Sequence, residues 1–207
     1  MTPQSLNERQ RQRLIEKYRD VNVDDSHWYE GVYEHMREDL AQRGFDTSDF
    51  AFTGFWSQGD GASFCGYVLD HNKFMKHYFS DESTYPTIRR AFREDVPTTI
   101  KLYRTSRQSV HEYCVQCEID FGEFESPNNS DDDFVIATVE AWNNQLKAEA
   151  SEFSAAVLDA MRAEMRQLYS DLEEEYNYQT ADAQVWDWIV NNLTEIDDDD
   201  LELVEDV

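Results

Sequence analysis

The 207-residue chain has few residues of several types, and each shortage excludes a class of protein. It contains three cysteines, seven glycines and four prolines, and no glycine or proline occurs after residue 127. A small, odd number of cysteines does not make a disulfide framework and suits a reducing compartment. No run approaches 18 consecutive apolar residues, and the first residues lack the apolar core of a signal peptide, so we expect neither a membrane span nor secretion.

Basic residues are also scarce. There are 18 Lys and Arg against 44 Asp and Glu, a net charge of −26, which argues against direct binding to DNA or RNA. Residues 1–107 carry a net charge of −2, whereas residues 108–207 carry three basic and 27 acidic side chains, a net of −24. This imbalance favours a positively charged partner, although an acidic tail and ordinary solvated helix faces would give the same composition.

The residues that are present indicate a folded α+β protein. Hydrophobic residues make up 40% of the chain and aromatic residues 14%, enough to form a core. We expect an antiparallel sheet of about four strands, packed with helices from both ends of the chain. The expected short helices are 6–18, 27–43, 73–79, 87–93 and 181–193, and the expected strands lie in a hairpin at 50–70 and at 98–105 and 110–121.

The longest pattern predicts a long C-terminal helix. From Val135 to Leu172 apolar residues recur at helical spacing, which gives one stripe along ~40 residues, or ~60 Å. We therefore expect one α+β domain over 1–194, with an acidic helical half from about residue 131. An acidic, flexible tail is expected over 195–207.

Acidic residues on this helix and in the tail form the first candidate site. Several acids lie seven residues apart, so each such pair shares one side of the helix. Carboxylates along a rod could imitate the phosphates of DNA, which carries one negative charge per ~1.7 Å. The candidate partner-binding acids are Asp131, Asp132, Asp133, Glu140, Glu149, Glu152, Asp159, Glu164, Asp171, Glu173, Glu174, Glu175, Asp197, Asp198, Asp199 and Asp200.

The glycine-rich segment 54–64, GFWSQGDGASF, is the second candidate site. Trp56 could stack on a ligand, while Gln58, Asp60 and Ser63 offer hydrogen-bonding groups. The alternative is structural, because Gly-Asp-Gly favours a tight turn and the aromatic residues can belong to the core. The segment lacks the Gly-Lys-Ser/Thr ending of a phosphate-binding loop.

No sequence pattern indicates a catalytic site or a metal-binding site. His111, Cys114 and Cys117 are close in sequence, but no second Cys/His pair lies at zinc-finger spacing, and positions three apart on a strand point to opposite faces. The histidines form no metal-binding helix motif, and no nucleophile elbow occurs. We expect no metal, no cofactor and no enzymatic activity.

Two segments resemble a family of small uncharacterised proteins from phages and other bacterial mobile elements. The first is GFWSQGDGASF at 54–64, and the second is EYNYQTADAQVWDWIVNN at 175–192. The family has no settled activity, so the resemblance implies no functional residue. It implies a phage or mobile-element setting, in which small acidic proteins often disarm host machinery. The aspartate-rich ending after Asn192 departs from the pattern.

These observations lead to one functional hypothesis and two alternatives. The hypothesis is a non-enzymatic, phage-type inhibitor or regulator in the bacterial host cytoplasm. It would bind a basic, nucleic-acid-handling host protein, such as a defence protein, by DNA or RNA mimicry, without contacting nucleic acid or a membrane itself. The alternatives are a small-ligand-binding or catalytic site at the Trp56–Ser63 turn, and an antitoxin-like partner of a basic toxin.

Overall fold

The structure is a computed structural model that describes residues 2–25, 27–106, 108, 110–125 and 133–196. These residues fall into two compact units, which are considered separately below. One unit lies within residues 34–169, and the other combines residues from 1–33 with residues from 170–207. The prediction of a single domain over 1–194 stays a prediction.

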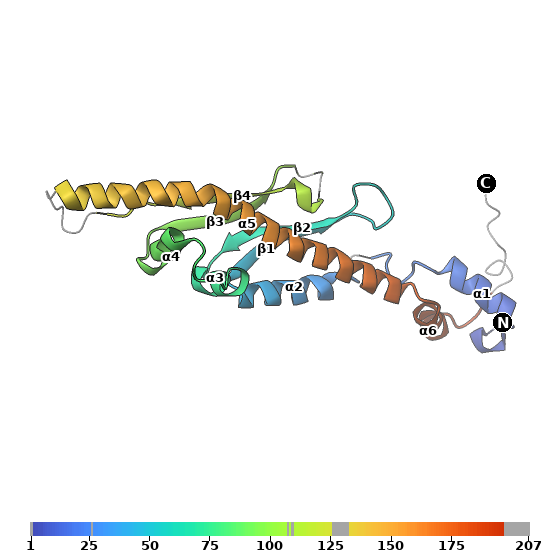
Figure 1. Cartoon of the computed structure of the whole chain (residues 1–207). Coiled ribbons are helices and arrows are strands. Elements are labelled where there is room, and N and C mark those ends of the chain that lie inside the picture. The colour runs from blue at the N-terminus through green and yellow to red at the C-terminus, as the bar shows by residue number, and fades with distance from the viewer. Residues whose placement is uncertain (1, 26, 107, 109, 126–132, 197–207) are drawn as a thin grey trace. The chain divides into compact units, whose positions relative to one another are not determined.

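The described residues form an α+β fold, as the sequence predicts (Figure 1). Four antiparallel strands are accompanied by helices from both ends of the chain, including a long C-terminal helix. In chain order the elements are η1 (Pro3–Ser5), α1 (Glu8–Lys17), α2 (Glu30–Gln42), β1 (Phe45–Phe52), β2 (Ala62–Val68), α3 (His71–Tyr78), α4 (Pro86–Arg93), β3 (Thr98–Arg104), η2 (Glu112–Cys114), β4 (Val115–Phe121), α5 (Asp133–Gln179) and α6 (Asp182–Asn192).

The sheet has the strand order β1-β2-β3-β4, with every neighbouring pair antiparallel. β1 begins at Phe45 rather than at the expected Phe50, because an irregularity between Thr47 and Asp49 interrupts the alternation that marks a strand. Gly66 is required in β2, since a Cβ there would lie 2.0 Å from the backbone oxygen of Asp46. The strand expected to start at residue 110 starts at Val115, after the short helix η2.

One face of the sheet is buried and the other is open. The buried face is made of Phe45, Phe64, Ile100, Leu102 and Val115, each at most 1% exposed. On the opposite face the register places Asp46, Tyr67, Lys101 and Glu118 in one row across the four strands. The ammonium group of Lys101 lies 5.7 Å from the Tyr67 ring centre, so the open face carries a cation–π contact.

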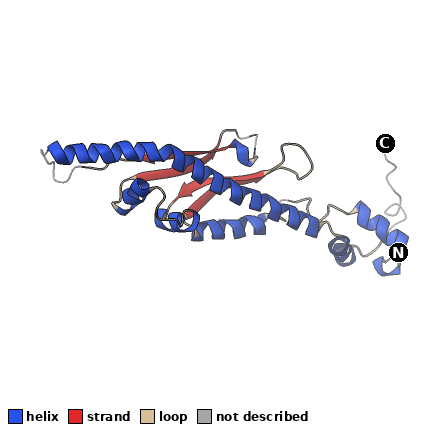
Figure 2. Ribbon diagram, in the orientation of Figure 1, coloured by secondary structure: helices blue, strands red, loops and turns tan. Residues whose placement is uncertain are grey.

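The long helix α5 (Figure 2) contributes more buried apolar residues than any other helix in the described part of the chain. Within residues 34–169, the predicted apolar stripe is confirmed by the burial of Val139, Leu146, Phe153, Val157, Met161, Met165 and Leu168. The ring of Phe153 is fully buried and lies 5.2 Å from that of Phe79 and 5.0 Å from that of Tyr85. These contacts pack α5 against the segment that contains α3 and α4.

The other unit has its own apolar cluster, formed by Leu14, Ile15, Val185, Ile189 and Ile196. Ile196 is 1% exposed, so the first residues of the predicted tail pack against this cluster. Arg19 closes the end of α5: its guanidinium donates to the Thr180 carbonyl at 3.1 Å and pairs with Asp182 at 2.6 Å. A cation at a helix C-terminus compensates the helix dipole.

Across the described part of the chain, none of the helices combines the length and the apolar character needed to cross a membrane.

Candidate functional site

Glu149, one of the predicted partner-binding acids, caps another helix. Its carboxylate accepts hydrogen bonds from the backbone N–H groups of Thr87 at 3.1 Å and Ile88 at 3.2 Å, and from the Thr87 hydroxyl at 2.7 Å. Thr87 and Ile88 lie in the first turn of α4, whose N-cap residue, Tyr85, makes no side-chain capping bond. Glu149 therefore satisfies N–H groups that an N-cap side chain ordinarily satisfies.

Glu164, another of these acids, forms an ion pair inside the fold. Its carboxylate lies 2.7 Å from the guanidinium of Arg43, and the two side chains are only 16% and 25% exposed. The buried hydroxyl of Tyr78 is close to this pair without a well-formed hydrogen bond. Burial raises the pKa of Tyr78 above its ordinary value. Glu164 is thus a structural residue in the 34–169 unit.

The remaining acids on α5 up to residue 169 do not form one negative stripe. Asp133, Glu140, Glu152 and Asp159 are exposed. At ~100° per residue, however, Glu140 and Glu152 point ~120° apart around the helix axis. Basic side chains are interspersed with the acids: Arg162 lies 3.9 Å from Asp159, and Lys147 and Arg166 are exposed on the same helix. This half of α5 does not resemble a continuous phosphate backbone.

The acids near the end of α5 lie together. Positions 171, 174, 175 and 178 share one helix face, and Asp171, Glu174, Glu175 and Tyr178 line a shallow cavity of about 360 Å³. Tyr178 is 55% exposed. Glu173 is half-buried and points ~160° away from Asp171 around the helix axis, so it does not lie on this face. We call Asp171, Glu174, Glu175 and Tyr178 the carboxylate surface. The predicted acids Asp131, Asp132 and Asp197–Asp200 lie outside the described residues.

The carboxylate surface belongs to a segment without basic side chains. Residues 170–196 contain seven acids and no lysine or arginine. Of these acids, Asp182 is paired with Arg19, whose hydrogen bond lowers the pKa of Asp182. Glu175 accepts a hydrogen bond from Gln179 at 2.7 Å. The basic residues of this unit lie in residues 1–33, and none of them lines the cavity, whose lining is three carboxylates and a tyrosine. A cationic group is the complementary ligand for that lining.

The four residues of the predicted turn site, Trp56, Gln58, Asp60 and Ser63, do not meet in one site. Trp56 is 75% exposed on the β1–β2 loop, which extends beyond the strands (Figure 1). Gln58 is also exposed, whereas the Asp60 carboxylate accepts a hydrogen bond from the Ser57 N–H at 2.7 Å within the loop. Ser63 is fully buried on β2, so its hydroxyl cannot contact a ligand held at the loop surface.

The loop is built as a turn. The Thr53 N–H donates to the Gly61 carbonyl at 3.0 Å, and Gly59 has a φ of +101°, which favours glycine. The β1–β2 loop spans Thr53–Gly61 and is longer than the turn expected at the Gly-Asp-Gly sequence, residues 59–61. Phe55 is buried against Tyr169, whose hydroxyl donates to the Gly54 carbonyl at 3.2 Å. These contacts account for Gly54, Phe55 and Gly59, whereas Trp56 remains exposed.

Ser63 offers a direct test of the structural interpretation. Its buried hydroxyl has no hydrogen-bond partner among the described residues, and an unpaired buried hydroxyl costs free energy. We expect Ser63→Ala to leave the free energy of unfolding unchanged or to raise it by up to about 1 kcal/mol in urea denaturation. Asp60→Ala should instead lower it by about 1 kcal/mol through loss of the turn bond. A large destabilisation by Ser63→Ala would contradict this interpretation.

The cysteines do not form a metal site in the described residues, where no group of three or more His, Cys, Asp or Glu side chains is placed to hold an ion. Cys114 lies in η2 and Cys117 in β4. Burial raises the pKa of the Cys117 thiol to about 11. A thiol of that pKa is almost entirely protonated at neutral pH, which makes Cys117 a poor nucleophile.

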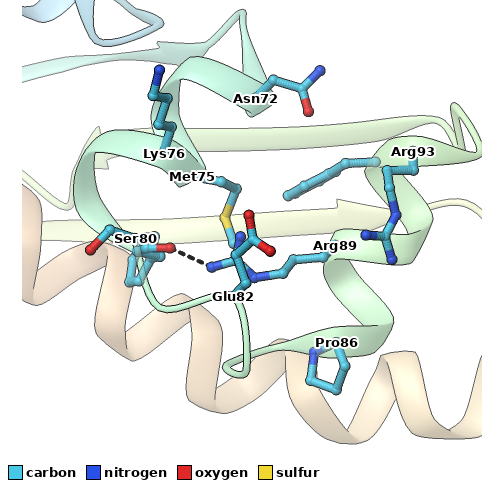
Figure 3. A pocket seen from close by; sticks show the side chains of 10 residues that line it. Asn72, Met75, Lys76, Ser80, Glu82, Pro86, Arg89 and Arg93 are labelled. Atoms are coloured by element: carbon cyan, nitrogen blue, oxygen red, sulfur yellow. Dashed lines mark hydrogen bonds between the residues drawn. The ribbon is translucent and has the colours of Figure 1, made fainter.

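The structure also contains a cavity that the sequence analysis missed. It has a volume of about 600 Å³ and lies between α3 and α4 in the 34–169 unit (Figure 3). Its lining includes three basic side chains: Lys76, Arg89 and Arg93. The sequence does contain a sign of this basic cavity: residues 71–93 have five Lys and Arg against two Asp and Glu, in a strongly acidic chain.

Comparisons with known proteins identify a family but no activity. Neither the curated proteins nor the solved structures include a match to this chain. A family model described as a domain of unknown function, DUF8835, matches residues 28–182. The matched range includes the β1–β2 loop, the cavity between α3 and α4, and the carboxylate surface. The chain therefore belongs to the DUF8835 family of uncharacterised domains.

Proposed function

We propose that this protein is a non-enzymatic binding protein that holds a basic protein partner on its carboxylate surface. The observation that carries the proposal is the charge of residues 170–196, which contain seven acids and no lysine or arginine. Glu174 is exposed, and Tyr178 presents 55% of its surface beside it. A lysine or arginine of a partner could bond to the carboxylates and lie against the tyrosine ring.

The partner class that fits this surface is a nucleic-acid-handling protein. Such proteins gather lysine and arginine side chains where they hold phosphates, and carboxylates can occupy the same positions. The mimicry we propose is local to the carboxylate surface, because the acids on the earlier part of α5 are interspersed with basic residues. Occupation of the partner's basic groove would inhibit it, as expected of a protein in the phage or mobile-element setting that the sequence resemblance implies.

The proposal is tested with a fluorescein-labelled peptide of nine arginines as the basic probe. We expect the triple variant Asp171→Asn/Glu174→Gln/Glu175→Gln to bind the probe roughly tenfold more weakly than the wild type at ~50 mM salt, because charge-assisted hydrogen bonds are lost. Fluorescence anisotropy with the full-length chain measures the affinity.

The matched control removes three acids from the earlier part of α5. Glu140→Gln/Glu152→Gln/Asp159→Asn changes the net charge by the same amount, and we expect it to weaken binding less than about twofold. Equal weakening by the two triple variants would contradict the proposal, because it would indicate attraction to net charge alone. Urea denaturation of both triple variants separates a loss of binding from a loss of stability, because Glu175 also accepts a hydrogen bond from Gln179.

A further inference from the structure

The cavity between α3 and α4 concentrates positive charge in a strongly acidic protein. Lys76 lies on α3, and Arg89 and Arg93 lie on α4. Glu82, on the connecting loop, is the acidic residue that lines the same cavity. Within the described part of the chain, none of the three basic side chains forms an ion pair within 4 Å. The cavity lining therefore has a net charge of about +2 at neutral pH.

Arg89 holds the cavity in shape. Its Nε donates to the Thr84 carbonyl at 2.8 Å, and one terminal nitrogen donates to the carbonyls of Asp81, at 2.8 Å, and Phe79. Figure 3 shows Arg89 extended across the cavity, with the dashed line marking one of these bonds. These carbonyls fix the loop between α3 and α4 but do not neutralise the guanidinium, so its positive charge remains beside the cavity.

The other basic groups are available to a ligand. Lys76 and Arg93 are exposed, and no hydrogen bond or ion pair occupies either one within the described residues. In Figure 3 the Arg93 guanidinium lies on the α4 side of the cavity, and Glu82 and Met75 lie near its middle. At physiological salt the screening length is ~8 Å, so these nearby charges outweigh the distant acids of the chain.

The apolar lining adds a second requirement. Met75 and Phe92 are buried, Phe79 is half-buried, and all three border the cavity. The volume of about 600 Å³ falls in the range of small-molecule sites and exceeds what a bare anion needs. A ligand that matches the lining thus carries about two negative charges and a flat apolar group.

We propose that this cavity binds an aromatic phosphate monoester of nucleoside monophosphate size. A phosphate monoester carries −1.5 to −2 charges at neutral pH, which matches the net charge of the lining. Arginine binds phosphate through two parallel N–H groups, a geometry open to Arg93. The ring would lie against Met75, Phe79 and Phe92. This proposal does not depend on the proposed function, whose surface belongs to the other unit.

The test is isothermal titration calorimetry of the full-length chain, with adenosine monophosphate, adenosine and inorganic phosphate as separate probes. We expect adenosine monophosphate to bind saturably and roughly tenfold more tightly than either other probe, because it alone satisfies both the charged and the apolar lining. Equal affinity for adenosine would overturn the phosphate requirement, and equal affinity for inorganic phosphate would overturn the apolar requirement. Absence of binding at millimolar probe would overturn the whole proposal.

Variants locate the site. Lys76→Gln and Arg93→Gln should each weaken adenosine monophosphate binding by roughly tenfold through loss of a charge-assisted bond. Lys73→Gln is the matched control: Lys73 is on α3, pairs with Asp70 and does not line the cavity, so its effect should stay below about twofold. Glu82→Gln should tighten binding, a gain that misfolding cannot produce. Equal losses in Lys73→Gln and Arg93→Gln, or weaker binding in Glu82→Gln, would contradict the assignment.

Discussion

Glu149→Ala is expected to lower the free energy of unfolding by about 3 kcal/mol, because the substitution removes three hydrogen bonds to a charged acceptor. The bonds are those from the Thr87 N–H, the Thr87 hydroxyl and the Ile88 N–H. Thr87 is 6% exposed and Ile88 is fully buried, so water cannot readily replace the lost acceptor. Urea denaturation followed by circular dichroism measures the change.

Glu152→Ala is the matched control for that prediction. Glu152 is on the same helix, three residues further along, and its side chain is exposed. Its removal should change the free energy of unfolding by less than about 0.5 kcal/mol. A similar effect of the two substitutions would show that Glu149 does not cap α4.

Glu164→Gln is expected to lower the free energy of unfolding by about 2 kcal/mol, since it leaves the Arg43 guanidinium without its closest partner. The expected loss of stability is smaller than for a fully buried ion pair because both side chains retain some exposure. In addition, Asp39 remains 3.4 Å from Arg43. Thermal and urea unfolding of the single variant give the measurement.

A double substitution separates the ion pair from simple packing. Replacing both charges, in Arg43→Met/Glu164→Leu, should recover much of the lost stability, because no buried charge is then unpaired. The pair Asp159–Arg162, at 3.9 Å and with the Asp159 side chain exposed, is the control, and Asp159→Asn should cost less than about 0.5 kcal/mol. If the double variant is no more stable than Glu164→Gln, the unpaired charge of Arg43 is not the cause of the lost stability.

Helical spacing predicted the core of α5 well. The recurrence of apolar residues identified Phe153, Met161 and Met165 as one face, and all three are fully buried. The same spacing could not distinguish structural acids from surface acids. Glu149 caps α4 through residues 61 and 62 positions away in the sequence, and Glu164 pairs with Arg43, which directly follows α2. Periodicity reports which residues share a face, not which element covers that face.

The cavity was missed for a related reason. Lys76 and Arg93 are 17 residues apart on two separate short helices, and each is unremarkable within its own helix. Arg89 folds the loop that brings these helices together, through carbonyl contacts that no side-chain pattern encodes. The turn motif shows the opposite case, because glycine and aspartate chemistry predicted a turn and the loop contacts account for those residues.

The most direct test of the central claim is the salt dependence of probe binding by the carboxylate surface. We expect the affinity of the wild-type chain for the nine-arginine peptide to fall by roughly tenfold or more between ~50 and ~200 mM salt, because screening weakens exposed charge pairs. The affinity of the Asp171→Asn/Glu174→Gln/Glu175→Gln variant should fall less steeply with salt. An affinity that does not change with salt, or an identical slope in the variant, would contradict binding of a basic partner at this surface.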